Sequence, residues 1–180
     1  MLKKAWKHFK TITKHKMLVM HGCFKVGLYK QGLLHDLSKY SPSEFLVGMK
    51  YYQGNRSPNN AEREDLGYSS AWLHHKGRNK HHYEYWLDYS TAIPGGFAPA
   101  KMPVRYVVEM FMDRIAASKI YNGEKYTQGD PLNYYRKGIE NAVIHPETRA
   151  LLEKLLVMLS EKGEEKTFAY IRKHLLHKRR

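Results

Sequence analysis

The chain has 180 residues, of which 42% are hydrophobic, and 31 lysines and arginines against 17 acidic residues give a formal net charge of +14. This size fits one folded domain, and no apolar run reaches the roughly 18 residues that a membrane span needs. The single cysteine, Cys23, excludes a disulfide within the chain, so the cytoplasm is the expected compartment. The positive charge favours an anionic partner such as nucleic acid, a phosphorylated metabolite or an acidic membrane surface.

The first segments are predicted to be helical. Apolar residues at near-helical spacing predict a helix over residues 4–30, and GLLHDLSK continues as a short apolar helix over residues 32–39. SPSE is typical of a helix start: Ser41 can cap, Pro42 suits the first helical position and Glu44 completes a capping box.

The middle of the chain alternates loops and helices. Residues 51–60 are rich in turn-forming side chains and predict a loop, residues 67–76 predict a helix, and the GRN turn ends it. The longest predicted loop covers residues 91–103. The most apolar predicted helix, VRYVVEMFMDRIAASKIY, follows over residues 104–121.

The remainder of the chain also predicts helices. One begins at 130–135, an amphipathic one covers 147–162 until Gly163 ends it, and a last one covers about 164–177. No segment predicts a strand. The expected architecture is a single all-α domain over residues 1–180, with a core at about 15–120 and C-terminal helices at about 130–177.

The stretch HDLSK combines residue types that suit a metal and a phosphate. On a helix, His35 and Lys39 are four residues apart and Asp36 and Lys39 are three apart, so all three lie on one side. Imidazole and carboxylate are ligands that iron, manganese and zinc prefer, and Lys39 beside them suits a phosphate oxygen. The alternative is that these residues form a solvated helix end.

Asp113 lies in the middle of the most apolar predicted helix. An ionised carboxylate on a buried face is costly unless it is paired or coordinates a cation. Arg114 is adjacent but points away by about 100°. We therefore expect Asp113 either to bind a metal or to pair with a basic residue of another helix.

The stretch HHKGRNKHH holds four histidines, and its turn lets its two ends converge. At least two of His74, His75, His81 and His82 are expected to bind a metal, although a surface stretch that binds anions would have similar composition. In the first helix, His15 shares a face with Val19 and Cys23.

His21 is the competing candidate from that helix, and on a straight helix it cannot share the face of His15.

HKMLV, GLLHDLSK, HHKGRNKHH and MDRIAAS, in that order, resemble the HD-domain metal-dependent phosphohydrolase superfamily over roughly residues 15–120. GLLHDLSKYSPSEF and AWLHHKGRNKHHYEYW are similar to a little-characterised bacterial branch of it. The resemblance implies a helical bundle with His15 as first ligand, the pair His35 and Asp36, and the final Asp113. The extra histidines are similar to those of members that hold two metals, and Lys39 matches a lysine that contacts phosphate.

The GRNKHH turn departs from the glycine-tyrosine-proline signature of the cyclic-dinucleotide phosphodiesterases, which argues against that activity.

The expected function is hydrolysis of a phosphate ester, such as a nucleotide, with one or two divalent transition-metal ions such as Fe, Mn or Zn. The expected metal ligands are His15, His35, Asp36, His75, His81, His82 and Asp113. The expected catalytic residues are Lys39, Arg78 and Asn79, with Lys119 as a further cation for phosphate and Glu109 as a hydrogen-bond partner of the ligands.

Three alternatives remain open at the level of sequence. The charge and the basic ends also suit a nucleic-acid-binding helical protein. A metal site could serve structure or sensing without turnover. A pair of irons could oxidise a substrate instead of hydrolysing it. The oligomeric state, the native metal and the substrate are not predicted.

Overall fold

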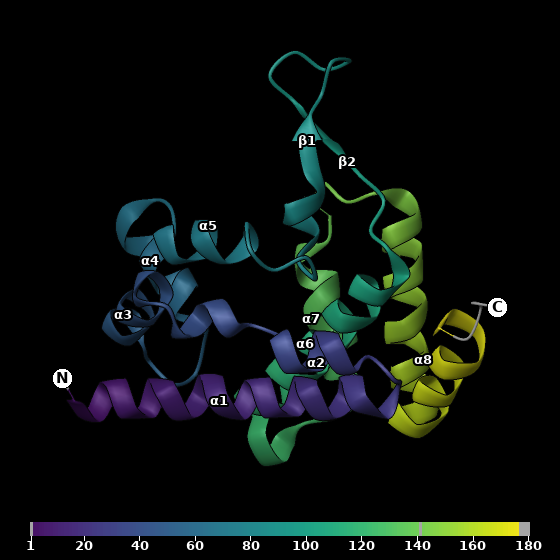
Figure 1. Cartoon of the computed structure of the whole chain (residues 1–180), viewed down its shortest axis with the longest axis horizontal. Helices are drawn as coiled ribbons and strands as arrows, with labels where there is room; N and C mark the ends of the chain where they lie inside the picture. The colour runs from purple at the N-terminus through teal and green to yellow at the C-terminus, as the bar shows by residue number, and fades with distance from the viewer. Residues whose placement is uncertain (1, 141, 177–180) are drawn as a thin grey trace.

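The structure is a computed structural model that describes residues 2–140 and 142–176. Within these ranges the chain forms an all-α bundle with one small two-stranded sheet (Figure 1), which confirms the expected fold class. The helices are α1 (Leu2–Lys25), α2 (Tyr29–Leu34), α3 (Pro42–Tyr51), α4 (Pro58–Leu66), α5 (Ser70–Lys76), α6 (Val104–Asn122), α7 (Asp130–Gly138) and α8 (Pro146–Tyr170). Shorter helical segments are η1 (Leu37–Tyr40), η2 (Tyr83–Trp86), η3 (Gly123–Lys125) and η4 (Ile171–Leu176).

Helix α6 forms the centre of the bundle and packs against both α1 and α8. Its buried side chains occur on nearly every side of the helix, which explains why apolar residues are not confined to one stripe of its sequence. Helix α1 instead buries one stripe at three- and four-residue spacing, which includes Ile12, Val19 and Cys23. The polar members of these buried positions, His8 and His15 on α1 and Glu109 on α6, are therefore held inside the bundle.

The first two helices end earlier than their apolar pattern predicted. Helix α1 stops at Lys25, and Gly27 adopts a left-handed conformation with φ of 85° before α2 begins. Helix α2 stops at Leu34, where the predicted helix over 32–39 gives way to a separate 3-10 turn, η1. His35 and Asp36 therefore lie between two elements and not on one regular helix.

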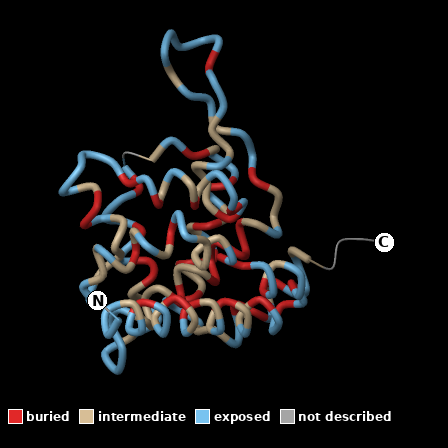
Figure 2. Tube along the Cα trace, turned by 60° about the vertical axis from the view of Figure 1, so that its left-hand side comes forward, coloured by how far each residue is buried: buried red, intermediate tan, exposed pale blue. Residues whose placement is uncertain are grey.

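The sheet was not predicted. Strands β1 (Leu87–Tyr89) and β2 (Phe97–Pro99) pair antiparallel, with Leu87 opposite Pro99. Both strands are short, and Figure 2 shows that their hairpin projects from the helices and is largely exposed. A hairpin of this length that packs only part of its surface leaves little apolar periodicity in the sequence.

Gly163 separates the two helices expected at the C-terminus. Its φ of 82° and ψ of 171° are not helical, so α8 consists of two helices that meet at a kink where the sequence predicted the helix end. The π-helical segment η4 follows to Leu176. Residue 177, the expected end of the last helix, lies outside the described residues. In the part of the chain that the structure describes, no helix combines the length and the apolarity that crossing a membrane would require.

Candidate metal centre

The backbone at Asp36 sets the geometry of the site. Asp36 has φ of 53° and ψ of 25°, and it is the only non-glycine residue with positive φ in residues 2–140 and 142–176. This left-handed conformation is uncommon for residues with a Cβ, and Asp tolerates it better than most because its short side chain is polar. The break turns the Asp36 carboxylate into the bundle, where it is only 2% exposed.

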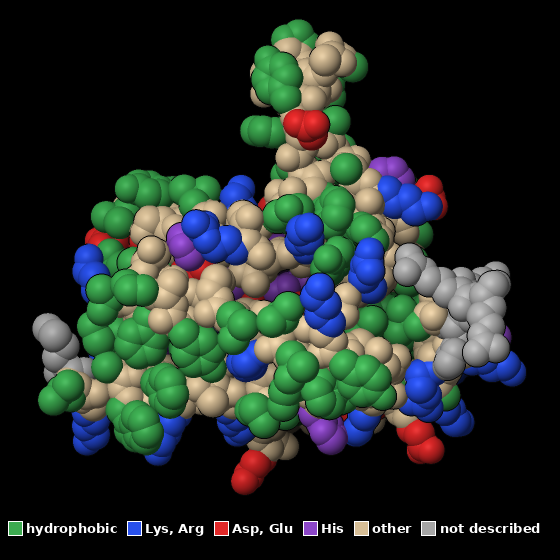
Figure 3. Space-filling view, viewed as in Figure 1, with side chains coloured by type: hydrophobic (Ala, Val, Ile, Leu, Met, Phe, Trp, Pro, Cys, Tyr) green, Lys and Arg blue, Asp and Glu red, His purple; other side chains and the backbone are tan. Residues whose placement is uncertain are grey.

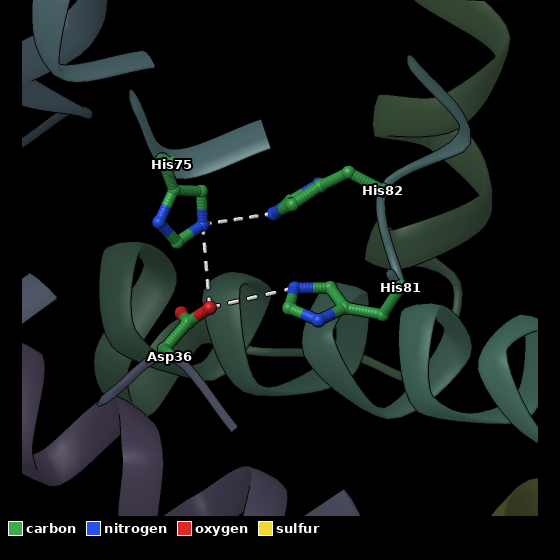
Figure 4. A group of neighbouring side chains, drawn as sticks. All are labelled: Asp36, His75, His81 and His82. Carbon is green, nitrogen blue, oxygen red and sulfur yellow. Dashed lines mark hydrogen bonds and ion pairs between the residues drawn. The ribbon is translucent and has the colours of Figure 1, made fainter. Parts of the chain in front are cut away.

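The two oxygens of Asp36 face different groups of side chains. Oδ2 lies 3.2 Å from His35 Nε2, 3.6 Å from His15 Nε2 and 2.6 Å from Lys39 Nζ. Oδ1 lies 3.2 Å from His75 Nε2 and 3.4 Å from His81 Nε2 (Figure 4). One carboxylate thus contacts both His75 at the end of α5 and His81 in the turn that follows this helix.

Three sets of potential ligands result. One set is His35, His81 and Glu109, and the other two, which we call the donor groups, both include Asp36. The first donor group is His15, His35, Asp36 and Asp113, and the second donor group is Asp36, His75, His81 and His82. Within each group the nitrogen and oxygen atoms that could bind a metal all lie within 4.8 Å of one another. The structure therefore brings together all seven residues that the sequence proposed as ligands.

Each group has one especially close contact besides those of Asp36. In the first, His15 Nε2 lies 2.8 Å from Asp113 Oδ1, which joins α1 to α6. In the second, His75 Nε2 and His82 Nε2 are 2.9 Å apart. Two ring nitrogens at this distance share one proton in a hydrogen bond, so one of the two rings accepts at Nε2 with a lone pair that could instead bind a metal.

The donor groups contain buried polar atoms without hydrogen bonds. In the described residues these include Nε2 of His15, His35 and His81 and both carboxylate oxygens of Asp36. The atoms lie near one another but lack hydrogen-bond geometry, which is costly for buried polar groups. Neutral imidazoles and carboxylates are ligands of Fe, Mn and Zn, so these residues fit divalent metal ions of that kind.

The electrostatics divide the histidines of the donor groups. Burial alone would lower the pKa of His35 and of His75, but the neighbouring carboxylates outweigh burial and raise both pKa values. Burial and the nearby Lys39 charge lower the pKa of His15, while burial, His81 and His75 lower the pKa of His82. Both imidazoles are therefore neutral at neutral pH, the state in which a ring nitrogen can bind a metal.

Burial disfavours the negative charge of Asp36. The positive charges of His35, Lys39 and His75 have the larger effect and hold the pKa of Asp36 well below the usual range. The carboxylate at the junction of the two donor groups is consequently ionised.

Two further carboxylates orient the histidines. Glu109 of α6 accepts hydrogen bonds at Oε1 from His35 Nδ1 at 2.9 Å and from His81 Nδ1 at 3.1 Å. Glu44 of α3 contacts His75 Nδ1 through Oε2 at 2.8 Å and His74 Nδ1 through Oε1 at 2.6 Å. Because each carboxylate accepts a hydrogen bond from Nδ1, the ring nitrogen that His35, His81 and His75 turn toward Asp36 is Nε2.

Glu109 was expected in this role, but Glu44 was expected to form a capping box with Ser41. Ser41 makes no side-chain capping hydrogen bond at the start of α3, and Glu44 is buried against the histidine stretch instead. The expected capping box was therefore wrong. The same local sequence permits either a capping box or a contact between Glu44 and the histidines. The packing of α3 on α5 selects the contact with the histidines.

The other histidine candidates are placed apart from the donor groups. His21 is on the exposed side of α1, whereas His15 is on the buried side. His74 is held by Glu44 and belongs to neither donor group.

Three expected phosphate or catalytic residues are placed differently than the sequence suggested. Arg78 is exposed, because the turn after α5 directs it outward, and it donates to the carbonyl oxygen of His74 at 3.3 Å. Asn79 is buried and donates to Ser38 Oγ and to the carbonyl oxygen of His75, both at 2.8 Å, so it holds the turn. Lys119 pairs with Glu164 of α8 at 2.5 Å.

A cavity of about 740 Å³ opens onto the donor groups. Its lining includes His15 and Asp113 of the first group and His75 and His82 of the second. Lys39 also lines it, as expected for a residue that contacts a ligand.

Arg114, which was expected to point away from Asp113, lines the same cavity, and its buried Nε has no hydrogen-bond partner among the described residues. The sequence analysis did not expect Arg114 in the site, because neighbouring residues on a helix point about 100° apart. The cavity is wide enough to contact both Asp113 and Arg114.

Comparison with known families adds one finding. The matching family model is described as a family of unknown function, DUF5662, and it covers residues 4–158. The chain belongs to this family. The matched region contains all seven donor residues, Glu44 and Glu109. Searches of curated proteins and of solved structures returned no match. Because membership of DUF5662 assigns no activity, the function has to be argued from the site.

One buried carboxylate of this DUF5662 chain anchors the helix that carries His75. Glu62 of α4 accepts hydrogen bonds from Ser69 Oγ at 2.5 Å, Ser70 Oγ at 2.6 Å and Ser70 N at 3.1 Å. It therefore caps the start of α5. Burial alone would raise the pKa of Glu62, but these hydrogen bonds lower it below the ordinary 4.5.

We expect Glu62→Gln to reduce the free energy of unfolding by about 1–3 kcal/mol, because the amide cannot accept all of these hydrogen bonds. Urea unfolding at neutral pH measures the loss. Glu64→Gln is the control, since Glu64 is on the same helix and pairs with Arg56 at the surface. Because the folded-state pKa is lowered, the contribution of Glu62 is present above pH 4.5 and is lost as the pH falls through the folded-state pKa. Equal losses in the two variants would contradict this anchoring role.

Proposed function

We propose that this protein is a metal-dependent phosphohydrolase that cleaves a phosphate ester, such as that of a nucleotide, with two divalent metal ions in its two donor groups. One observation carries the proposal: the oxygens of Asp36 face separate donor groups, and Lys39 lies 2.6 Å from Oδ2 in the lining of a cavity. The order of the motifs around His15, the pair His35 and Asp36, and Asp113 supports the same conclusion through its resemblance to HD-domain phosphohydrolases.

The two donor groups would hold the metals, with Asp36 as the residue common to both. Divalent ions at such a site activate water near neutral pH and stabilise negative charge on phosphoryl oxygens. Glu44 and Glu109 keep the histidine rings in the tautomer that presents Nε2 to the metals. The chain thus supplies both the ligands and the groups that orient them.

Lys39 is suited to bind a phosphate oxygen. Its amine forms an ion pair with Asp36, its side chain is 28% exposed, and it lines the cavity, so its N–H donors are available there. Burial disfavours its charge, but attraction to Asp36 and Asp113 outweighs burial and raises the pKa of Lys39. The ammonium charge is therefore permanent at the pH of any assay. Arg114 adds a planar guanidinium, which can bind two phosphate oxygens at once.

The shape of the site favours a small molecule. Pockets that enclose small ligands have volumes of roughly 300–1,000 Å³, and this cavity has about 740 Å³. Aromatic side chains of Tyr52, Trp72 and Tyr83 form part of its lining and offer flat apolar surface to a ligand. A concave site of this kind suits a phosphorylated metabolite better than a nucleic-acid duplex, which needs an extended basic surface.

The test is phosphate release from a panel of phosphomonoesters and nucleotides by protein loaded with Mn²⁺, Fe²⁺ or Zn²⁺. We expect Lys39→Met to lower kcat/KM by about 10²–10³, the usual effect of removing a group that stabilises developing charge, while the metal content stays unchanged. Arg78→Met is the control, because Arg78 carries the same charge but lies outside the cavity. Its activity should equal that of the wild type.

Three outcomes would contradict the proposal. If the metal-loaded protein releases no phosphate from any member of the panel, the site binds metal but does not catalyse hydrolysis. Oxygen uptake by the iron-loaded protein under the same conditions would replace hydrolysis with oxidation. If Arg78→Met lost as much activity as Lys39→Met, the cavity would not be the place of reaction.

A further inference from the structure

Helix α1 has a second apolar face besides the one that it buries. At about 100° per residue, the buried positions from His8 to Cys23 fall within an arc of about 80°, and a separate arc of similar width holds Trp6, Phe9, Met17 and Phe24. These four side chains are exposed, Trp6 by 57% and Met17 by 51%. A helix that only packs on a core needs one apolar stripe, so the second stripe requires another explanation.

The apolar surface continues from α1 onto the next elements. The rings of Phe24 and Tyr29 are 5.2 Å apart, and those of Phe9 and Tyr40 are 6.0 Å apart, so α2 and η1 lie beside this stripe. Figure 3 shows hydrophobic side chains gathered over α1 and α2 on one face of the molecule. We call this surface the exposed apolar face; it consists of Trp6, Phe9, Met17, Phe24, Tyr29, Leu33, Leu34 and Leu37.

A stripe of lysines borders the exposed apolar face. Lys3, Lys7, Lys10, Lys14 and Lys25 fall within an arc of about 60° next to the apolar arc of α1. Residues 1–35 contain eight lysines and no aspartate or glutamate. Among residues 2–140 and 142–176, the lysines that form ion pairs are Lys39, Lys101 and Lys119, so the stripe has no acidic partner.

We propose that α1, α2 and η1 dock the protein on an anionic membrane surface. Lysine heads can contact lipid phosphates, while tryptophan, phenylalanine and leucine side chains lie at the boundary of the acyl chains. This combination of an apolar stripe and a basic border is the pattern of helices that lie in the plane of a membrane interface. Leu34 and Leu37 of this face flank the donor residues His35 and Asp36 in the sequence, but their side chains are exposed, and the proposal does not depend on the proposed hydrolysis.

Two other occupants fit the surface less well. In a symmetric dimer, each copy presents the same patch to the other, so two lysine stripes without acidic residues would be brought together. A nucleic acid could use the lysines and the aromatic rings, but Met17, Leu33, Leu34 and Leu37 would remain without apolar partners. A lipid surface uses both kinds of side chain.

The experiment is flotation of the full-length protein with vesicles of phosphatidylcholine alone or with phosphatidylserine added. We expect binding to the anionic vesicles and at least about tenfold weaker binding to the neutral ones, since each lysine near an anionic surface contributes favourably. Trp6→Ser/Phe24→Ser/Leu34→Ser and Lys3→Gln/Lys7→Gln/Lys14→Gln should each weaken binding about tenfold or more.

The matched control removes the same number of charges from α8, as Lys154→Gln/Lys162→Gln/Lys166→Gln, and should bind like the wild type. Circular dichroism checks that every variant is folded, which is expected because the replaced side chains are exposed.

No binding of the wild type to anionic vesicles would overturn the proposal. If the α8 control loses as much vesicle binding as the α1 lysine variant, net charge alone attracts the protein to the vesicles. This result would also overturn the proposal. A dimer in sedimentation that only the apolar variant loses, without vesicle binding, would assign the surface to a second copy of the chain. Wild-type binding to RNA that is tighter than to vesicles would assign it to nucleic acid.

Discussion

Asp36→Asn is expected to abolish metal binding. Asp36 is the residue common to both donor groups, and its two oxygens face different sets of histidines. Asparagine keeps the volume of the side chain and tolerates the left-handed backbone at this position, but it removes the negative charge and one of the two ligand oxygens. Loss of a ligand should lower the metal affinity by more than the 10- to 100-fold that is typical of the residues around ligands.

Elemental mass spectrometry on untagged protein measures this effect. Wild-type protein should carry one or two equivalents of a divalent transition metal, and the variant should carry almost none. Asp88→Asn, which changes an exposed carboxylate on β1, is the control and should keep its metal. A variant at Asp36 that holds as much metal as the wild type would show that the donor groups are not a metal centre.

Removal of metal should lower the thermal stability of the wild type strongly. A ligand that binds only the folded state adds about 4 kcal/mol when its concentration is about 1,000 times its Kd. For a chain of this length, 1 kcal/mol shifts Tm by roughly 2–4 °C, so chelation should lower Tm by roughly 8–16 °C. The buried nitrogen and oxygen atoms that lack partners in the donor groups are the physical reason.

Calorimetry before chelation, after chelation and after return of the metal measures this shift and its reversal. Asp36→Asn serves as the control, because chelation should leave its Tm unchanged. A wild-type Tm that does not respond to chelation, in protein known to contain metal, would contradict the coupling of the centre to the fold. A stabilising metal alone does not establish turnover, which is why the Lys39→Met assay is needed beside this measurement.

Helix α6 shows how much the sequence determined by itself. Its apolar pattern predicted residues 104–121, and the structure places it at Val104–Asn122. The pattern is a local property, because each apolar residue at helical spacing adds to the same buried surface. The same reasoning singled out Asp113, since a carboxylate inside an apolar helix needs a partner wherever the helix packs. His15 was preferred over His21 through the resemblance to HD-domain phosphohydrolases.

The relations between side chains of different elements were decided only by the tertiary structure. A left-handed residue at Asp36 interrupts the predicted helix over 32–39, and this single backbone conformation determines which oxygen faces which histidine. Glu44 contacts His75 and not its own helix start, because α3 packs on α5. Arg78 points outward while Arg114 lines the cavity. Periodicity and capping patterns describe a helix by itself, whereas such contacts depend on how helices that are distant in the sequence are brought together.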